Sequence, residues 1–328
     1  MNRTMETHPK LHAFSLAIHR VLSRSRILSK IWLSLIGMLL RALPGFPLKD
    51  NIANNLMAVP WPSSLTFGPR SVSLCPGVTV SLIPHVGEFD FRAALSRSLR
   101  YETEVFQVLA QRMRGYDAIL EIGANVGVFS LFFCAQRRHK DVPVFCLEPS
   151  REAFRRLLAN LDIDPAPNVY AIPAAVSGKC GLLPFFEPTG HLTNGSLLEG
   201  FASIFSERVQ RNLVPSIDGN QLAELLMPFG KLLLKIDVEG AEADVLSSLL
   251  PLIVEKTPDI VLEVLEPFTE SLNAITDIAN LYQFYLVTPD GLTATKRFKA
   301  HPLYRDYLLV HKEAQQPTCA LGEVVTEI

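Results

Sequence analysis

The chain has 328 residues, of which 48% are hydrophobic, so it can form one large domain with extensions or two smaller domains. The net charge of −2 hides an asymmetry, because residues 1–50 hold eight Lys and Arg against two acidic residues and the remainder is acidic. An acidic body lacks the basic patch of a nucleic-acid-binding domain, so we expect no nucleic-acid partner. The five cysteines include no Cys-x-x-Cys pair, which indicates a reducing compartment without disulfides or structural zinc.

Apolar residues recur at three- and four-residue steps through residues 10–42, which predicts an amphipathic helix. Its uncharged run, residues 31–40, would be about 15 Å long, half of a bilayer core, and Pro44 and Pro47 follow, so we expect no membrane span. Three interpretations stay open: a helix packed on the domain or a partner, a basic anchor lying on a membrane, and a transit peptide.

The predicted elements divide the chain into four parts. Residues 1–60 form the basic helical extension with a Pro-rich linker, and residues 61–115 add short strands (64–84) and a helix (99–113). Residues 116–315 form the main domain, and residues 316–328 form a tail.

Strands and helices alternate in the main domain. The predicted strand–helix pairs are 118–122 with 126–136, 143–147 with 150–162, 232–236 with 240–250, and 259–263 with a helix over about 268–281. A further strand covers 168–176, and residues 181–228 look less regular. The turn Pro289-Asp290-Gly291, between the apolar runs 284–288 and 304–311, is a hairpin signal. We therefore predict an α/β fold whose parallel sheet ends in an antiparallel hairpin.

A glycine turn follows the first of these strands. An apolar run ends in Glu121, and Gly123 and Gly127 bracket a turn that opens a helix. Glycine lets a ligand approach the backbone, and the helix N-terminus favours anionic atoms, here a carboxylate. The next strand ends in Glu148, where an acidic side chain is suited to bind ribose hydroxyls. Together these features predict a nucleoside-containing cofactor on a Rossmann-like sheet.

Four sequence blocks make the resemblance to a known family specific. They are Glu-Ile-Gly-Ala-Asn-Val-Gly at 121–127, Leu-Glu-Pro at 147–149, Ala-Ala-Val-Ser at 174–177, and Lys-Ile-Asp-Val-Glu-Gly-Ala-Glu at 235–242. In this order and spacing the chain resembles the FkbM family of S-adenosylmethionine-dependent methyltransferases over about residues 100–310. Gly178 departs from the family pattern, which usually has Asp at this position.

The resemblance implies a class I methyltransferase sheet of seven strands, the last one antiparallel, and S-adenosylmethionine as the cofactor. It implies methyl transfer, usually to a hydroxyl of a sugar or a polyketide-like metabolite. The cofactor residues carried over are Glu121, Gly123, Ala124, Asn125 and Gly127 around the methionine part, Glu148 at the ribose, and Ser177 near the adenine. Gly178 puts the usual acidic adenine contact in doubt.

The densest block also supplies candidates for catalysis. Asp237 directly follows a buried strand, so it should face the crevice at the carboxyl edge of the sheet, close to the sulfonium and the acceptor. Glu239 and Lys235 are the other candidates, and Glu242 lies in the first helical turn. Each acidic residue could instead cap the helix or stabilise its dipole. Three carboxylates leave a divalent metal open, but no oxygen-ligand loop is readable and we expect none.

Other residues have weaker signals. Glu263 ends the fifth strand and could bind the acceptor, and His191 lies in a loop that could cover the site. Tyr101 and Glu104 could touch the cofactor or simply pack. The acceptor pocket would come from residues 60–100, 178–215 and 264–275, where four phenylalanines could line it or form a core: Phe185, Phe186, Phe201 and Phe205.

The predicted function is S-adenosylmethionine-dependent O-methylation of a small-molecule hydroxyl, by in-line transfer with a carboxylate assisting. Placement of the reactants can lower the activation barrier by about 7–11 kcal/mol. A base can raise the rate by about 10²–10⁴-fold. One alternative is an NAD-dependent oxidoreductase, although the turn lacks Gly-x-Gly-x-x-Gly. Another is a non-catalytic, methyltransferase-like scaffold at a membrane. We expect a cytoplasmic protein with possible membrane contact through residues 10–42.

Overall fold

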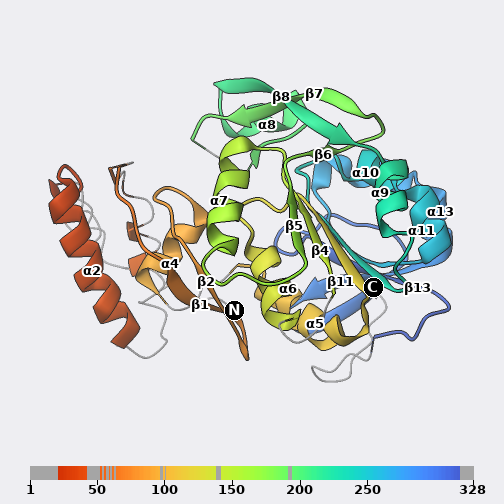
Figure 1. The fold of residues 1–328 in the computed structure, drawn as a ribbon, viewed down its shortest axis with the longest axis horizontal. Helices are drawn as coiled ribbons and strands as arrows, with labels where there is room; N and C mark the ends of the chain where they lie inside the picture. The colour runs from red at the N-terminus through yellow and green to blue at the C-terminus, as the bar shows by residue number, and fades with distance from the viewer. Residues whose placement is uncertain are drawn as a thin grey trace. The chain divides into compact units, whose positions relative to one another are not determined.

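The computed structural model describes residues 21–42, 52–53, 55–56, 59, 61–62, 64–96, 99, 101–137, 142–190 and 194–317 (Figure 1). The chain divides into two compact units, residues 1–74 with 79–101, and residues 75–78 with 102–328. The domain boundaries expected at residues 60, 115 and 315 stay predictions. His191 and the first part of the expected N-terminal helix, residues 10–20, lie outside the described residues.

The first unit contains the helix α2 (Arg26–Ala42), a two-stranded sheet of β1 (Arg70–Cys75) and β2 (Val78–Leu82), and the short helices η1 (Phe89–Phe91) and α4 (Arg92–Leu95). Within the described residues the helix predicted over 10–42 is interrupted at residues 23–25. Ser25 explains the break, because its hydroxyl accepts the amide of Leu28 and so begins a new helix. The buried side of α2 joins a core with Trp61 and Phe91.

The main sheet of the second unit has eight strands in the order β12-β11-β13-β10-β9-β3-β4-β5. Their bounds are β3 Ala118–Ile122, β4 Val144–Leu147, β5 Val169–Ile172, β9 Leu232–Ile236, β10 Asp259–Glu263, β11 Tyr282–Thr288, β12 Gly291–Thr295 and β13 Asp306–His311. Strand β13 runs antiparallel to both β10 and β11. This order is that of a class I methyltransferase sheet and confirms the predicted fold class. The hairpin at Pro289–Asp290 adds β12 as an eighth strand.

Apolar runs explain why the central strands form. Every residue of β3 and β9 is buried, as expected for a parallel sheet covered on both faces. The covering helices are α5 (Thr103–Arg112), α6 (Val128–Arg137), α7 (Arg151–Leu161), α9 (Gly219–Leu226), α10 (Glu242–Ser248), α11 (Leu250–Lys256), α12 (Thr269–Asn273) and α13 (Thr276–Leu281). In place of the single helix predicted over 240–250 the structure has α10 followed by α11. In place of the one predicted over 268–281 it has α12 followed by α13. Pro251 lies at the start of α11, where its fixed φ favours a new first turn.

Residues 181–228 are more regular than expected. They form β7 (Gly181–Pro188), α8 (Glu199–Phe205), β8 (Val209–Ile217) and α9. The strand predicted over 168–176 breaks near Pro173, and its end, β6 (Ala175–Val176), joins β8 and β7 in a separate three-stranded sheet. Figure 1 shows β7, β8 and α8 together at one end of the second unit.

A buried ion pair joins α5 to the main sheet. Asp259 begins β10, and its Oδ2 lies 2.5 Å from Nη2 of Arg112 and 2.6 Å from the hydroxyl of Tyr116, which donates to it. Since almost none of the Asp259 side chain is exposed, removing it leaves a buried cation without its carboxylate.

Asp259→Ala should therefore lower the free energy of unfolding by about 3–5 kcal/mol. Urea denaturation followed by circular dichroism measures this change. Glu152→Ala is the matched control, because Glu152 pairs with Arg155 and Arg156 at the surface and should contribute about 1 kcal/mol or less. Equal losses in the two variants would contradict the structural role of Asp259.

Candidate functional site

The glycine turn after β3 is held between the ends of two neighbouring strands. Gly123 has φ +84°, and a Cβ at this position would lie 1.7 Å from the carbonyl oxygen of Asp237. The amides of Gly123 and Ala124 both donate to the carbonyl of Leu147, each at 2.9 Å. Asn125 also has a positive φ, +51°. The turn is therefore packed tightly between the ends of β4 and β9, and Gly123 is needed there because any side chain would meet the backbone of Asp237.

The sequence suggested that Gly127 lies at a ligand, but its close neighbour in the structure is the helix α7. Its φ is +89°, and a Cβ there would lie 2.5 Å from Cδ1 of Leu157 in α7. The side-chain amide of Asn160, also in α7, donates to the carbonyl of Val126 at 2.7 Å. Gly127 thus allows α7 to pack closely on the turn, and a ligand is not needed to explain it.

Glu148, directly after β4, ties this turn to the start of α7. Its Oε2 accepts the amide of Asn125 at 2.8 Å and its Oε1 accepts the amide of Ser150 at 2.7 Å. Burial raises the pKa of Glu148 to about 7, against the effect of these two hydrogen bonds. Each carboxylate oxygen has a second lone pair that could accept a hydroxyl. The hydroxyl of Ser150 donates to Glu187 of β7 at 2.6 Å, an acidic neighbour that the sequence did not indicate.

Glu121 is buried within the fold. It is 2% exposed, and its Oε2 accepts the hydroxyl of Ser130 in α6 at 2.6 Å. Burial raises its pKa to about 7, while the hydrogen bond and the charge of Lys235 act in the opposite direction. In the sheet, Glu121 of β3 stands beside Lys235 of β9.

Lys235 and Asp237 form a pair at the end of β9. The Nζ of Lys235 lies 3.1 Å from Oδ2 of Asp237 and 4.7 Å from the ring centroid of Phe129, and Lys235 is 1% exposed. Burial alone would lower the pKa of Lys235, but the charges of Asp237, Glu102 and Asp306 outweigh it and raise the pKa. Lys235 is therefore a fixed cation that holds the carboxylate of Asp237 in place.

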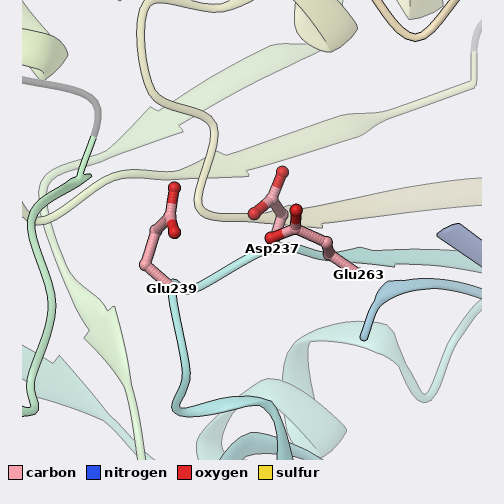
Figure 2. Close-up of side chains that lie close together, drawn as sticks. All are labelled: Asp237, Glu239 and Glu263. Carbon is pink, nitrogen blue, oxygen red and sulfur yellow. The ribbon is translucent and has the colours of Figure 1, made fainter. Parts of the chain in front are cut away.

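Glu239 and Glu263 complete a carboxyl cluster with Asp237. One oxygen of each lies within 4.8 Å of the others, and Figure 2 shows the three side chains close together; Asp237 and Glu239 follow β9, and Glu263 is the last residue of β10. Burial raises the pKa of Glu239 to about 10 and that of Glu263 to about 8, and the charge of Asp237 adds to both effects. Nη1 of Arg305 lies 3.7 Å from Glu263. Close carboxyls of this kind can share and accept protons near neutral pH.

Glu242 stabilises the turn that carries Glu239, one member of this cluster. It is fully buried, and its Oε1 accepts the amides of Val238 and Gly240, each at 3.1 Å. The hydroxyl of Ser196 donates to the carbonyl of Glu239 at 2.8 Å. Glu239 itself has φ +56°, a conformation that costs energy and is held here by these neighbours. Glu242 therefore has a structural role, because it fixes the turn that carries Glu239.

An apolar cavity adjoins the same turn. Its volume is about 490 Å³, and its lining includes Leu197, Phe201, Ile204 and Phe268. It lies close to the turn because Phe268 contacts the position of Gly240, where a Cβ would meet its ring at 2.6 Å. Two of the three segments expected to build the acceptor pocket contribute to it. Phe185, by contrast, belongs to a small core with Ala175 of β6 and Val214 of β8.

The remaining candidates make contacts of their own. Ser177 is buried, and its hydroxyl contacts Ser216 at 3.0 Å and the carbonyl of Lys179 at 3.1 Å. Tyr101 contacts Phe89 within the first unit, with ring centroids 4.6 Å apart and the rings tilted by 31°. Asp306, which the sequence analysis missed, stands beside Glu263 in the sheet, and burial raises its pKa to about 7.

The raised pKa values predict how stability depends on pH. Glu121, Glu148 and Glu263 have pKa values of about 7, 7 and 8 in the folded protein, mainly through burial, against an ordinary value of 4.5. Between about pH 5 and pH 7 the folded chain holds protons that the unfolded chain has released, so the free energy of unfolding falls as the pH rises.

We expect a fall of at least about 1 kcal/mol per pH unit over this range, measured by urea denaturation. Glu263→Gln should make the dependence shallower, because the group no longer titrates. Glu270→Gln, at an exposed site on α12, should leave it unchanged. Stability that is constant or increases from pH 5 to pH 7 would overturn the expected burial effect.

The sheet order, the glycine turn and the carboxyls beyond β9 and β10 define an α/β methyltransferase. Comparison with known families agrees: the family model "Methyltransferase FkbM domain" matches residues 121–286, half of the chain. The chain belongs to the FkbM methyltransferase family, whose cofactor is S-adenosylmethionine. The family match gives no support to the NAD-dependent alternative.

Individual relatives are distant. The methyltransferase sdnD of Sordaria araneosa is 27% identical over 174 residues, which cover 45% of this chain and 66% of that protein, just under two thirds. The FkbM methyltransferase structure from Methylobacillus flagellatus KT is 15% identical, with 60% of this chain and 43% of that chain covered and a TM-score of 0.38. SMU.1697c from Streptococcus mutans, solved with SAH, is 9% identical, with 63% and 95% covered and a TM-score of 0.36.

The cofactor loop fits such a group. The Oδ1 atom of Asn125 is buried and has no hydrogen-bond partner among the described residues. It lies on the same turn as Gly123, and the carboxylate of Glu148 accepts the backbone amide of the same residue. An unpaired acceptor and an acidic side chain on one turn suit a ligand with hydroxyl and amino groups.

Proposed function

We propose that this chain is an S-adenosylmethionine-dependent O-methyltransferase that acts on a hydroxyl of a sugar or a polyketide-like small molecule. The observation that carries the proposal is the Lys235–Asp237 pair, with Glu239 and Glu263 beside it, directly against the glycine turn. The close approach of Gly123 to the backbone of Asp237 supports the idea that one bound cofactor reaches both.

In this proposal Gly123, Ala124, Asn125 and Glu148 would contact the cofactor, and Ser177 would lie near its adenine. When bound, the cofactor supplies a methyl group on a cationic sulfonium. Glu148 would accept the ribose hydroxyls while keeping its two backbone hydrogen bonds, which hold its carboxylate in one orientation. Gly127 and Glu121 would act indirectly, by packing α7 and α6 against the turn.

The carboxyl cluster would handle the acceptor. An alcohol is a weak nucleophile, so a carboxylate within hydrogen-bond reach of its proton raises the rate by about 10²–10⁴-fold. Asp237 is our choice for this contact, because Lys235 fixes its orientation. Glu239 and Glu263, whose pKa values are raised to about 10 and about 8, would be largely protonated at neutral pH and could donate hydrogen bonds to the acceptor. The apolar cavity beside Phe268 would hold the less polar part of the acceptor.

Calorimetry with S-adenosylmethionine tests the cofactor half of the proposal. Glu148→Gln replaces an acceptor-only carboxylate by an amide and should weaken binding at least about 100-fold, because charged hydrogen bonds contribute about 1.5–3 kcal/mol each. Glu152→Gln, on the surface of α7, is the matched control and should bind like the wild type. Equal affinities for wild type and Glu148→Gln would exclude Glu148 from the cofactor site.

The reaction half can be tested with panels of acceptors. Labelled S-adenosylmethionine should transfer its methyl group to hydroxyl compounds, and not to matched amines or carboxylic acids. The expectation of no metal is tested in the same assay. The cluster of Asp237, Glu239 and Glu263 has a spacing that a cation could also use, so a loss of activity on adding a chelator would contradict that expectation.

A further inference from the structure

The helix α2 presents an unusually apolar exposed face. Six large apolar side chains on it are between 48% and 71% exposed: Ile27, Leu28, Ile31, Leu35, Met38 and Leu39. At 100° per residue, these six fall within an arc of about 120° on the helix surface. Apolar residues scattered singly over a surface are ordinary, but a continuous apolar stripe exposed to solvent indicates an interaction site.

The opposite side of α2 is already occupied. Leu33 and Leu40 are buried in the core of the first unit, together with Trp61 and Phe91. The helix is thus anchored by one face, and the exposed stripe is a separate surface. The stripe cannot be explained as the core-facing side of an amphipathic helix, because that side is a different arc.

Charge indicates what covers the stripe. Arg26 and Lys30 are exposed and lie one turn apart on the flank of the helix between the stripe and the buried side. Residues 21–42 also include Arg24 and Arg41 and contain no acidic residue. A second copy of the same helix would bring like charges together, whereas an anionic lipid surface complements them.

We propose that α2 docks the protein on an anionic lipid bilayer, lying in the interface with its apolar stripe inserted and Arg26 and Lys30 at the headgroups. Interfacial helices combine these two features: an apolar face of Leu, Ile and Met, and a basic border. None of the helices in the described part of the chain combines the length and hydropathy of a bilayer span, so α2 would lie on the surface. This inference does not depend on the proposed reaction.

Vesicle flotation of the full-length chain tests the proposal. Vesicles of equal parts phosphatidylcholine and phosphatidylserine should carry the wild type, and pure phosphatidylcholine should carry at least tenfold less. The double substitution Ile31→Glu with Leu35→Glu places charges in the stripe and should reduce binding at least tenfold. The matched control, Leu182→Glu with Leu303→Glu, changes two exposed leucines elsewhere and should leave binding unchanged.

A second variant separates the charge contribution. Arg26→Gln with Lys30→Gln should weaken binding to the anionic vesicles about fivefold per residue, and the remaining binding should be less sensitive to salt. All variants should have the circular dichroism spectrum of the wild type, because the changed side chains are exposed. No flotation of the wild type, equal loss in the leucine control, or a dimer that the Ile31/Leu35 variant dissociates would each overturn the proposal.

Discussion

Asp237→Asn is expected to lower kcat by about 10²–10⁴-fold, the usual contribution of a general base, with a much smaller effect on cofactor affinity. The substitution keeps the shape of the side chain and still offers an oxygen to Lys235, whose Nζ lies 3.1 Å from Oδ2 in the wild type. It removes the negative charge that would receive the acceptor proton. Asp277→Asn, in the exposed first turn of α13, is the matched control and should be silent.

Residual activity in Asp237→Asn is part of the expectation, because placement of the methyl group and the acceptor contributes the larger share of the rate. Glu263→Gln and Glu239→Gln should show smaller losses of kcat, since these carboxyls would be protonated and would donate hydrogen bonds to the acceptor without receiving its proton. Single-turnover rates with saturating cofactor distinguish these effects from binding. An Asp237→Asn variant that reacts as fast as the wild type would remove Asp237 from the mechanism.

Gly123→Ala should have the largest effect on stability among the glycine substitutions. The new Cβ would lie 1.7 Å from the carbonyl oxygen of Asp237, and the backbone φ of +84° is itself strained for alanine. The end of β9 is hydrogen-bonded to β3 through the amide of Asp237 and the carbonyl of Ile122, at 3.0 Å, so neither strand can move alone. We expect a loss of about 3 kcal/mol or more in the free energy of unfolding, and loss of cofactor binding.

Gly200→Ala provides the control for this substitution. Gly200 lies in α8, and a Cβ there would meet nothing within 4 Å. Alanine should therefore stabilise the helix, by up to about 1 kcal/mol. Urea denaturation compares the two variants directly. If Gly123→Ala unfolded at the wild-type midpoint, the close approach of the turn to β9 would be refuted.

The central sheet could be predicted from sequence because burial on both faces leaves an uninterrupted apolar run. Strands β3 and β9 have this pattern, and the predicted bounds 118–122 and 232–236 are those of the structure. The turn at Pro289–Asp290 was also readable, since its turn residues have a specific conformational role, but its partner strand was wrong: the turn leads into β12, and the predicted run 304–311 contains β13, which pairs with β11 on its other side. The order of the strands could not be read from periodicity, and the resemblance implied only seven strands with an antiparallel last one, whereas the main sheet has eight.

The second sheet could not be read in the same way. Strands β7 and β8 pair along their whole length but are exposed at many positions, so they show no continuous apolar run. Pro184 and Pro215 also count against strands in a sequence pattern, although each can occupy an edge or a non-bonded position. The break between β5 and β6 depends on which sheet each half joins, which is a property of the tertiary structure.

The candidate site was only partly readable. The sequence predicted that the turn at Gly123 and the carboxylates Glu148 and Asp237 would meet at one edge of the sheet, and the structure brings them together. It did not indicate Glu187 or Asp306, because each comes from a distant segment and has no motif around it. The pairing of Lys235 with Asp237 is a side-chain contact across two residues of one strand end, which a motif cannot specify.

Mass spectrometry of products formed with deuterium-labelled S-adenosylmethionine tests the account most directly. The wild-type chain, mixed with a fractionated pool of small hydroxyl compounds, should yield a product that carries one labelled methyl group on oxygen, and Asp237→Asn should form it at least about 100-fold more slowly. Label found on nitrogen or carbon, or an undiminished rate in Asp237→Asn, would contradict the claim that this carboxylate assists methyl transfer to a hydroxyl.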